Sequence, residues 1–225
     1  MERIPTGIKG LDEMLNGGLP KNYSILVMGG PGTGKTLFGA QFLHKGTEEG
    51  ERTVYLTLEE TPKRIVQNIK NTFGWDFSQL EKKGLLSIIP VQKYNMQHLY
   101  DVIQAEITQK ETRRVLIDSV TMIKMYFERE FEFRRNLFEL LDFLGSMECT
   151  TLMTAERNYL SRENMQPELE EFVVDGTIAL YNIPRKNERI RALEILKMRG
   201  IEHSSSVFPF QITKSGFRVV QEEVL

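Results

Sequence analysis

A glycine-rich run near the amino end constrains this 225-residue chain more than any other feature. It matches the pattern G-x-x-x-x-G-K-T (Walker A) and consists of Gly29, Gly30, Pro31, Gly32, Thr33, Gly34, Lys35 and Thr36. The apolar residues 24–28 before it predict a strand, and residues 35–49 after it predict a helix. Such a run between a strand and a helix predicts a phosphate-binding loop.

The residue types in the loop indicate what it would bind. Glycines allow successive backbone N–H groups to turn toward phosphate oxygens, and the positive end of the following helix adds to the attraction. Lys35 would bring a charge to the outer phosphates, and the Thr36 hydroxyl would be a ligand for Mg²⁺. The alternative is a glycine turn without a ligand, against which the strand and helix context argues. We expect the run to bind ATP with Mg²⁺.

The alternation of strand and helix patterns continues after the loop. Further strands are predicted at 53–58, 86–91, 114–118 and 150–154, and helices at 61–72, 96–110 and 130–147. A helix between two strands returns the chain to the same edge of the sheet, so these strands should be parallel. Together with residues 24–28 they predict an α/β fold with five parallel strands and helices on both faces, in one domain spanning residues 1–225.

The pattern changes in the last third of the chain. Strand-like segments follow at 176–182, 190–198 and 207–213, and turn-forming residues join them at 184–188 and 214–216. Because short turns join antiparallel strands, we expect these segments to look antiparallel and to form a carboxy-terminal extension of the sheet.

A carboxylate at the end of an apolar strand is a second candidate for the metal site. Mg²⁺ prefers six oxygen ligands and keeps several waters, so Asp118, which ends the strand predicted at 114–118, could hold one of those waters. The alternative is that Asp118 only caps the turn that follows. The loop upstream favours the metal role.

Hydrolysis would also need a group that orients and deprotonates water. Glu59 and Glu60 follow the strand predicted at 53–58, at the edge where parallel sheets place their ligands. Either could be the base. The alternative is that both are acids at a helix amino end before Pro62, where the helix dipole favours them.

Several short motifs resemble, in the same order, those of the RecA-superfamily ATPases of the KaiC type. Besides the loop they are PTGIKGLD at 5–12, GGLP at 17–20, EETP at 59–62, FGWD at 73–76, IDSVT at 117–121, MTAER at 153–157 and LKMRG at 196–200. The resemblance covers nearly the whole chain and implies a RecA-like P-loop NTPase core. KaiC has two such domains in tandem, so this sequence is similar to the single-domain KaiC-like proteins of archaea.

The resemblance implies a homohexameric ring with ATP between neighbouring subunits. In that family the Lys-x-Arg-Gly motif reaches the nucleotide of the adjacent subunit, which gives Lys197 and Arg199 a role in trans, with His203 nearby. A cation at the γ-phosphate would neutralise charge that develops in the transition state. The residues alone favour a solvated strand face for Lys197 and Arg199, so this role depends on the resemblance.

The sequence departs from one half of KaiC at a pair of adjacent positions. The autophosphorylating half of KaiC carries a Ser-Thr pair where this chain, before Asp175, has Glu171 and Phe172. Neither can accept a phosphoryl group, and the segment at 170–173 instead resembles the half of KaiC that hydrolyses ATP without being modified. We expect no phosphorylation cycle at this place.

Composition narrows the remaining possibilities. A formal net charge of -2 provides no overall attraction to nucleic acid, and no apolar run is long enough to span a membrane. The single cysteine, Cys149, should be a buried packing residue, and three scattered histidines predict no zinc site. These features fit a cytoplasmic protein that does not insert into membranes.

Three functions are compatible with the sequence. The first is a slow Mg-dependent ATPase with sites at subunit interfaces. The second is a DNA-binding recombinase or strand-remodelling ATPase, for which residues 129–135 offer arginines among phenylalanines, a pattern more typical of an amphipathic helix edge. The third is a nucleotide-gated scaffold with little turnover. Nucleic acid is therefore a possible but not favoured partner, and the sequence names no protein partner other than the chain itself.

Overall fold

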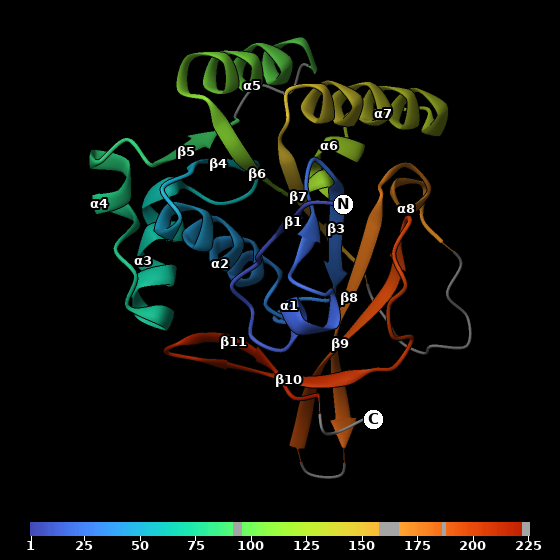
Figure 1. Cartoon of the computed structure of the whole chain (residues 1–225). Coiled ribbons are helices and arrows are strands. Elements are labelled where there is room, and N and C mark those ends of the chain that lie inside the picture. Colours follow the sequence, from blue (N-terminus) through green and yellow to red (C-terminus); the bar gives the residue numbers. More distant parts are fainter. Residues whose placement is uncertain (92–95, 158–166, 186–187, 222–225) are drawn as a thin grey trace.

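A mixed β-sheet with helices on both faces organises the chain (Figure 1). The computed structural model describes residues 1–91, 96–157, 167–185 and 188–221. The strands are β1 (Arg3–Ile4), β2 (Leu19–Pro20), β3 (Ser24–Gly29), β4 (Arg52–Thr57), β5 (Leu86–Pro90), β6 (Thr112–Asp118), β7 (Thr150–Glu156), β8 (Gly176–Arg185), β9 (Glu188–Met198), β10 (Phe208–Thr213) and β11 (Gly216–Val219). The helices are α1 (Leu11–Met14), α2 (Lys35–Glu48), α3 (Pro62–Phe73), α4 (Phe77–Lys82), α5 (Met96–Lys110), α6 (Val120–Lys124), α7 (Glu130–Ser146) and α8 (Leu169–Val173).

The main sheet has the strand order β11-β10-β9-β8-β3-β7-β6-β4-β5 among the described residues. The six strands from β8 to β5 in this order are parallel, and β9, β10 and β11 add to β8 in antiparallel fashion. The expected α/β class, with helices on both faces and an antiparallel carboxy-terminal extension, is confirmed. A separate pair, β1 and β2, lies outside this sheet.

The prediction of five parallel strands was wrong, because β8 is a sixth. The turn pattern predicts an antiparallel strand at 176–182, but β8 pairs in parallel with β3, with Ile25 facing Gly176 and Gly29 facing Leu180. Only its other edge is antiparallel, toward β9. The turn residues at 184–188 indicate the hairpin between β8 and β9. No local pattern indicates which strand pairs with the other edge of β8.

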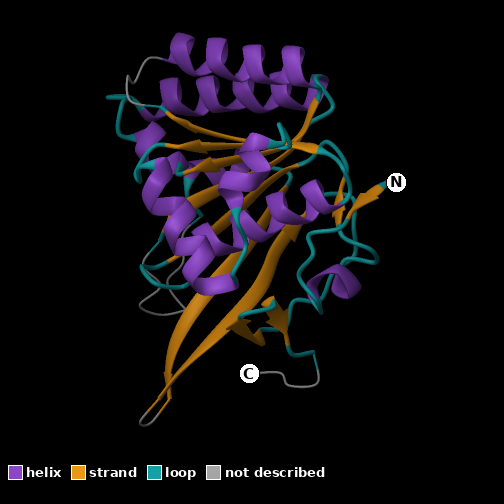
Figure 2. Cartoon of the chain, turned by 90° about the vertical axis from the view of Figure 1, so that its left-hand side faces the viewer, coloured by secondary structure: helices purple, strands orange, loops and turns teal. Residues whose placement is uncertain are grey.

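Two apolar cores lie on the two faces of the sheet. One packs α1 to α4 against the sheet, and the other packs α5, α6 and α7 against the opposite face. Figure 2 shows the sheet between these helical layers, with the β8–β9 hairpin extending beyond them. The helices bury residues at helical spacing, as α3 does with Ile65, Ile69 and Phe73. Strand β3 is buried along its whole length, which is typical of a central parallel strand.

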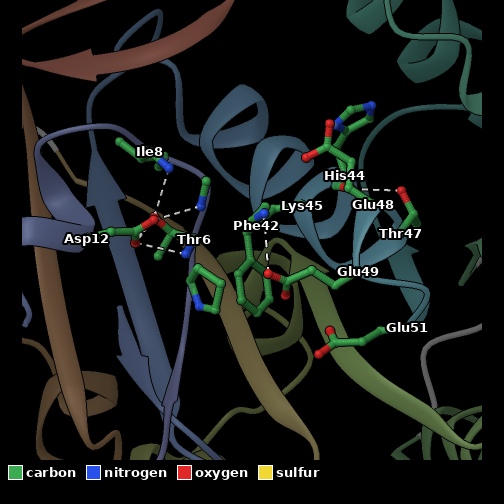
Figure 3. A network of polar contacts seen from close by, with 12 residues as sticks. Thr6, Ile8, Asp12, Phe42, His44, Lys45, Thr47, Glu48, Glu49 and Glu51 are labelled. Atoms are coloured by element: carbon green, nitrogen blue, oxygen red, sulfur yellow. Dashed lines mark hydrogen bonds and ion pairs between the residues drawn. The ribbon is translucent and has the colours of Figure 1, made fainter. Parts of the chain in front are cut away.

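A buried arginine joins the amino-terminal segment to this core. The side chain of Arg114 on β6 is fully buried and pairs with Glu51 and, at 2.8 Å, with Glu49. It also donates to the carbonyl oxygens of Pro5 (2.6 Å) and Phe42 (3.1 Å). Figure 3 shows these acids at the end of α2, beside the turn in which Asp12 accepts hydrogen bonds from Thr6.

We expect Arg114→Met to lower the free energy of unfolding by about 3 kcal/mol, because two carbonyls and two carboxylates lose a buried donor. Urea denaturation followed by circular dichroism measures this. Arg113→Met is the matched control, because Arg113 is partly exposed and lies 3.7 Å from Glu148, so its loss should cost under about 1 kcal/mol. Equal effects of the two substitutions would contradict the structural role of Arg114.

Candidate functional site

The carboxyl ends of four neighbouring strands meet at one edge of the sheet. In the strand register Gly29, the last residue of β3, faces Glu156 at the end of β7. Thr57 at the end of β4 faces Asp118 at the end of β6. Ligands of open parallel sheets bind outside this edge. The predicted loop and the predicted carboxylates therefore lie together.

The loop after β3 folds around its own lysine. The Lys35 ammonium donates to the carbonyl oxygens of Gly29 at 2.9 Å and Gly30 at 3.2 Å. Gly32 and Gly34 have φ of 73° and 102°, a region that side chains disfavour. A Cβ on Gly34 would also lie 2.9 Å from Ile212 and from Phe217, so the carboxy-terminal strands pack directly against the loop.

The charge of Lys35 lies among three carboxylates. Burial lowers the pKa of the Lys35 ammonium, and the carboxylates of Glu156, Asp118 and Glu59 oppose that shift. Two of these carboxylates were predicted. Glu156 was not singled out, although it ends an apolar strand as Asp118 does, and that position is the signal that could have found it.

Asp118 is held by three hydroxyl groups. One carboxylate oxygen accepts from Thr36 at 3.0 Å and from Tyr55 at 2.6 Å, and the other accepts from Thr154. Burial, with the nearby Asp118 carboxylate, raises the pKa of Tyr55 well above its usual range, so Tyr55 stays a neutral donor. A cis peptide bond joins Asp118 to the next residue, Ser119.

Thr36 and Asp118 offer the kind of ligand that Mg²⁺ prefers. Both are oxygen donors, and they lie within hydrogen-bond distance of each other beside the loop. Across the residues that the structure describes, no group of three or more histidine, cysteine, aspartate or glutamate side chains gathers to hold a metal ion. These donors therefore suit an ion that takes its other ligands from phosphates and water.

The structure separates Glu59 from Glu60. A Glu59 carboxylate oxygen accepts from the hydroxyl of Ser119, directly after Asp118. The Glu60 carboxylate instead lies 3.2 Å from Arg64 Nε and 3.4 Å from Asn68 Nδ2, both on α3. Glu59 thus lies on the side of the loop, and Glu60 on the side of the helix.

Lys197 and Arg199 lie at the other end of the sheet from the loop of the same chain. Lys197 faces Thr177 on β8, which in turn faces Leu26, three residues before the end of β3. Three strand residues span about 10 Å. His203, in the segment after β9, has its Nδ1 3.1 Å from the carbonyl oxygen of Ser204. The structure does not bring these three residues to the loop of their own chain.

The Lys197 and Arg199 side chains are held by the end of α8 and the residues after it. Lys197 donates to the carbonyl oxygens of Glu171 at 2.9 Å and Val174 at 2.6 Å. Arg199 donates at 3.1 Å both to Asp175 Oδ1 and to the carbonyl oxygen of Phe172. Burial, with the nearby Arg199 charge, lowers the pKa of Lys197.

The arginine and phenylalanine segment of α7 forms one wall of a surface groove of about 390 Å³. Phe133 is buried in the core, as an amphipathic helix requires, but Phe131, Phe138 and Phe172 are 72%, 59% and 50% exposed. The groove is lined by Phe131, Arg134, Arg135, Phe138, Phe172, Val173 and Arg199. The groove therefore brings residues of α7 together with Arg199 on one surface.

Other predicted residues have packing roles. Cys149 is buried as expected, and burial raises its pKa to about 12. His44 stacks on Trp75 with ring centres 4.1 Å apart. None of the described helices is both long and apolar enough to span a membrane.

Comparisons with known proteins agree with the motifs. A family model described as "ATPase: KaiC" matches residues 4–224. The chain is 38% identical to a UPF0273 protein of Methanopyrus kandleri over 100% of the chain and 94% of that protein, and 35% identical to a UPF0273 protein of Methanocaldococcus jannaschii over 100% and 99%. It is 38% identical to the circadian clock oscillator protein KaiC of Synechococcus elongatus over 96% of the chain but only 44% of that protein.

Proposed function

The chain belongs to the KaiC family of ATPases, and from this premise we propose that it binds Mg-ATP and hydrolyses it slowly at sites shared between subunits of a ring. The observation that carries the proposal is the gathering of Lys35, Thr36, Asp118 and Glu59 at one edge of the sheet. We further propose that residues 1–225 act as a single ATPase domain.

Each residue at this edge has a distinct part in the proposal. The backbone N–H groups of the run from Gly29 to Thr36 bind the phosphates, and Lys35 exchanges its two loop carbonyls for phosphate oxygens. Thr36 would hold Mg²⁺ through its hydroxyl oxygen, and Asp118 would hold one of the waters on the ion. When bound, Mg²⁺ neutralises charge that develops on the transferred phosphoryl group.

We propose Glu59 as the base that orients the attacking water. Its carboxylate is exposed at the carboxyl edge and is tied to Ser119, next to Asp118, whereas the Glu60 carboxylate lies beside Arg64 on α3. A base must lie within hydrogen-bond reach of the water beside the γ-phosphate.

Glu59→Gln should therefore lower kcat about 10²-fold, because the amide orients water but accepts no proton. ATP binding, measured with a fluorescent ATP analogue, should change less than about threefold, within the scatter of an exposed substitution. Glu60→Gln is the matched control and should keep more than about half of the turnover, since it changes only partly exposed contacts with Arg64 and Asn68. The reverse ranking of the two variants would assign the base to Glu60.

The distribution of charge supports head-to-tail assembly. Glu59, Asp118 and Glu156 lie at the loop edge, and the groove presents Arg134, Arg135 and Arg199 beside exposed phenylalanines. When the basic groove of one copy binds the acidic loop edge of the next, the contact is heterologous. Such contacts close into a ring when the rotation from one copy to the next divides evenly into a full turn. We propose that the groove contacts the loop edge of a neighbouring copy, so that Lys197, Arg199 and His203 complete its site.

One experiment separates the three functions that the sequence leaves open. Specific ATP turnover is measured across protein concentration, with and without single-stranded DNA at low salt. A shared site predicts that turnover per chain rises as rings form and ignores DNA. Stimulation by DNA would favour the recombinase, for which the exposed phenylalanines and arginines of the groove are the relevant feature. A ring that binds ATP without turnover would favour the scaffold.

A further inference from the structure

Helix α8 lies between the loop edge and the two cations proposed to act in trans. Near its amino end, Lys124 of α6 pairs with Glu168 at 2.8 Å and with Glu170 at 3.3 Å. Arg157, directly after β7, pairs with Glu171. Strands β6 and β7, which lead to these two basic residues, are the strands that end in Asp118 and Glu156. The helix is therefore fastened to the ends of two site strands.

The Arg157–Glu171 pair is the more enclosed of these attachments. Both of its side chains are largely buried, at 12% and 13% exposed, whereas Lys124 is 31% exposed and its partners Glu168 and Glu170 are 48% and 6% exposed. The backbone N–H of Arg157 also donates to the carbonyl oxygen of Gly29, the first residue of the loop, at 3.1 Å. Charge pairs shielded from water are weakened little by salt and hold a fixed geometry.

The other end of α8 sets the direction of the two cations. Carbonyl oxygens of Glu171 and Val174 accept from Lys197, and that of Phe172 accepts from Arg199. The last carbonyls of a helix carry partial negative charge and attract cations. Because Lys197 and Arg199 are bonded to this segment, a shift of α8 moves them with it.

We infer that Arg157 and Glu171 are positioning residues, which hold α8 so that Lys197 and Arg199 point toward the nucleotide of the neighbouring copy. This inference rests on the proposed shared site. It also says which nucleotide site depends on the pair. That site is the neighbour's, although Arg157 follows Glu156 at the loop edge of its own chain. Loss of the pair should thus leave the chain's own loop able to bind and act.

Mixed rings test that direction. A Lys35→Met chain has a defective loop but still supplies Lys197 and Arg199 to its neighbour. An Arg199→Ala chain has an intact loop but supplies its neighbour with Lys197 alone. When the two are unfolded, mixed equally and refolded, about one site in four has both halves intact, so a shared site predicts that turnover returns. No return in this mixture would overturn the proposed shared site itself.

Arg157→Met alone should lower kcat roughly 10- to 100-fold, because a misplacement of about 1 Å can cost 10²-fold in rate. Mixed with Lys35→Met chains, it should regain turnover as Arg199→Ala does. Mixed with Arg199→Ala chains, it should regain no turnover, since neither variant supplies well-placed Lys197 and Arg199 side chains to its neighbour. The opposite result, recovery with Arg199→Ala and not with Lys35→Met, would place the defect in the chain's own loop and overturn the inference.

Two further variants keep the test decisive if Arg157→Met folds poorly. Glu171→Gln removes the charge pair from the other side and keeps the length of the side chain, so it should show the same mixing pattern. Arg157→Lys retains the charge and should keep most of the turnover that Arg157→Met loses. Binding of a fluorescent ATP analogue should stay within about threefold of the unchanged chain in each variant, as expected when the loop is intact. Full turnover by Glu171→Gln in intact rings would also overturn the inference.

Discussion

Lys35→Met is expected to abolish ATP turnover and to weaken ATP binding by about 10³-fold. Two unit charges about 4 Å apart near a protein surface attract by roughly 4 kcal/mol, which corresponds to about 10³-fold in affinity. The substitution removes that attraction, and the chain offers no described replacement within the loop, where Lys35 already contacts Gly29 and Gly30. Binding is measured with a fluorescent ATP analogue and turnover by phosphate release.

Lys45→Met provides the matched control for this loss. Lys45 lies on the same helix, but its ammonium pairs with Glu49 at 3.2 Å in a partly exposed contact. Its removal should leave ATP binding unchanged and cost under about 1 kcal/mol of stability. Without nucleotide, the thermal unfolding midpoint of Lys35→Met should lie within a few degrees of that of the unchanged chain, because only two loop hydrogen bonds are lost. ATP binding retained by Lys35→Met would contradict the assignment of the loop.

Arg199→Ala is expected to lower kcat about 10³-fold while rings still form. A cation that arrives at the γ-phosphate from a neighbour stabilises charge that develops only in the transition state, and in known cases this is worth at least about 10³ in kcat. The half-exposed Arg199 pairs with Asp175, so its loss should cost little stability. Turnover is compared at protein concentrations where sedimentation confirms the ring.

The control for Arg199 lies on β9, the strand that ends directly before Arg199. Arg189 of β9 donates to the carbonyl oxygen of Asn182 and is exposed at the far end of the hairpin, so Arg189→Ala should keep full turnover. Ring formation with full turnover by Arg199→Ala would contradict the role in trans. Loss of the ring itself would instead make Arg199 an assembly contact.

Local sequence patterns predicted the loop, the strand and the helix that flank it, and the family. The glycine spacing and the strand and helix periods are properties of nearby residues, so they can be recognised in the sequence without knowing the fold. The placement of Asp118 beside Thr36, 82 positions earlier, also followed, because parallel strands bring their carboxyl ends to one edge. The same rule applied to Glu156 would have identified it as well.

Contacts between distant segments away from the carboxyl edge of the sheet were not predictable in this way. From the sequence, Arg114 at the start of an apolar strand is expected to be exposed to solvent. In the fold it is buried, and its partners Glu49 and Pro5 come from two other segments. The pairing of β8 with β3 likewise depends on where the chain returns after β7.

The sequence by itself determined the KaiC-type ATPase fold and predicted a phosphate loop, because motifs and hydrophobic periods are properties of adjacent residues, and few folds place a strand, this glycine pattern and a helix in that order. Only the tertiary structure decided that Glu59 lies toward Asp118 while Glu60 lies toward α3, and that Lys197 and Arg199 lie away from their own loop. Those outcomes depend on the direction in which neighbouring side chains leave the backbone and on which strands lie side by side, and both are settled by packing across the whole sheet.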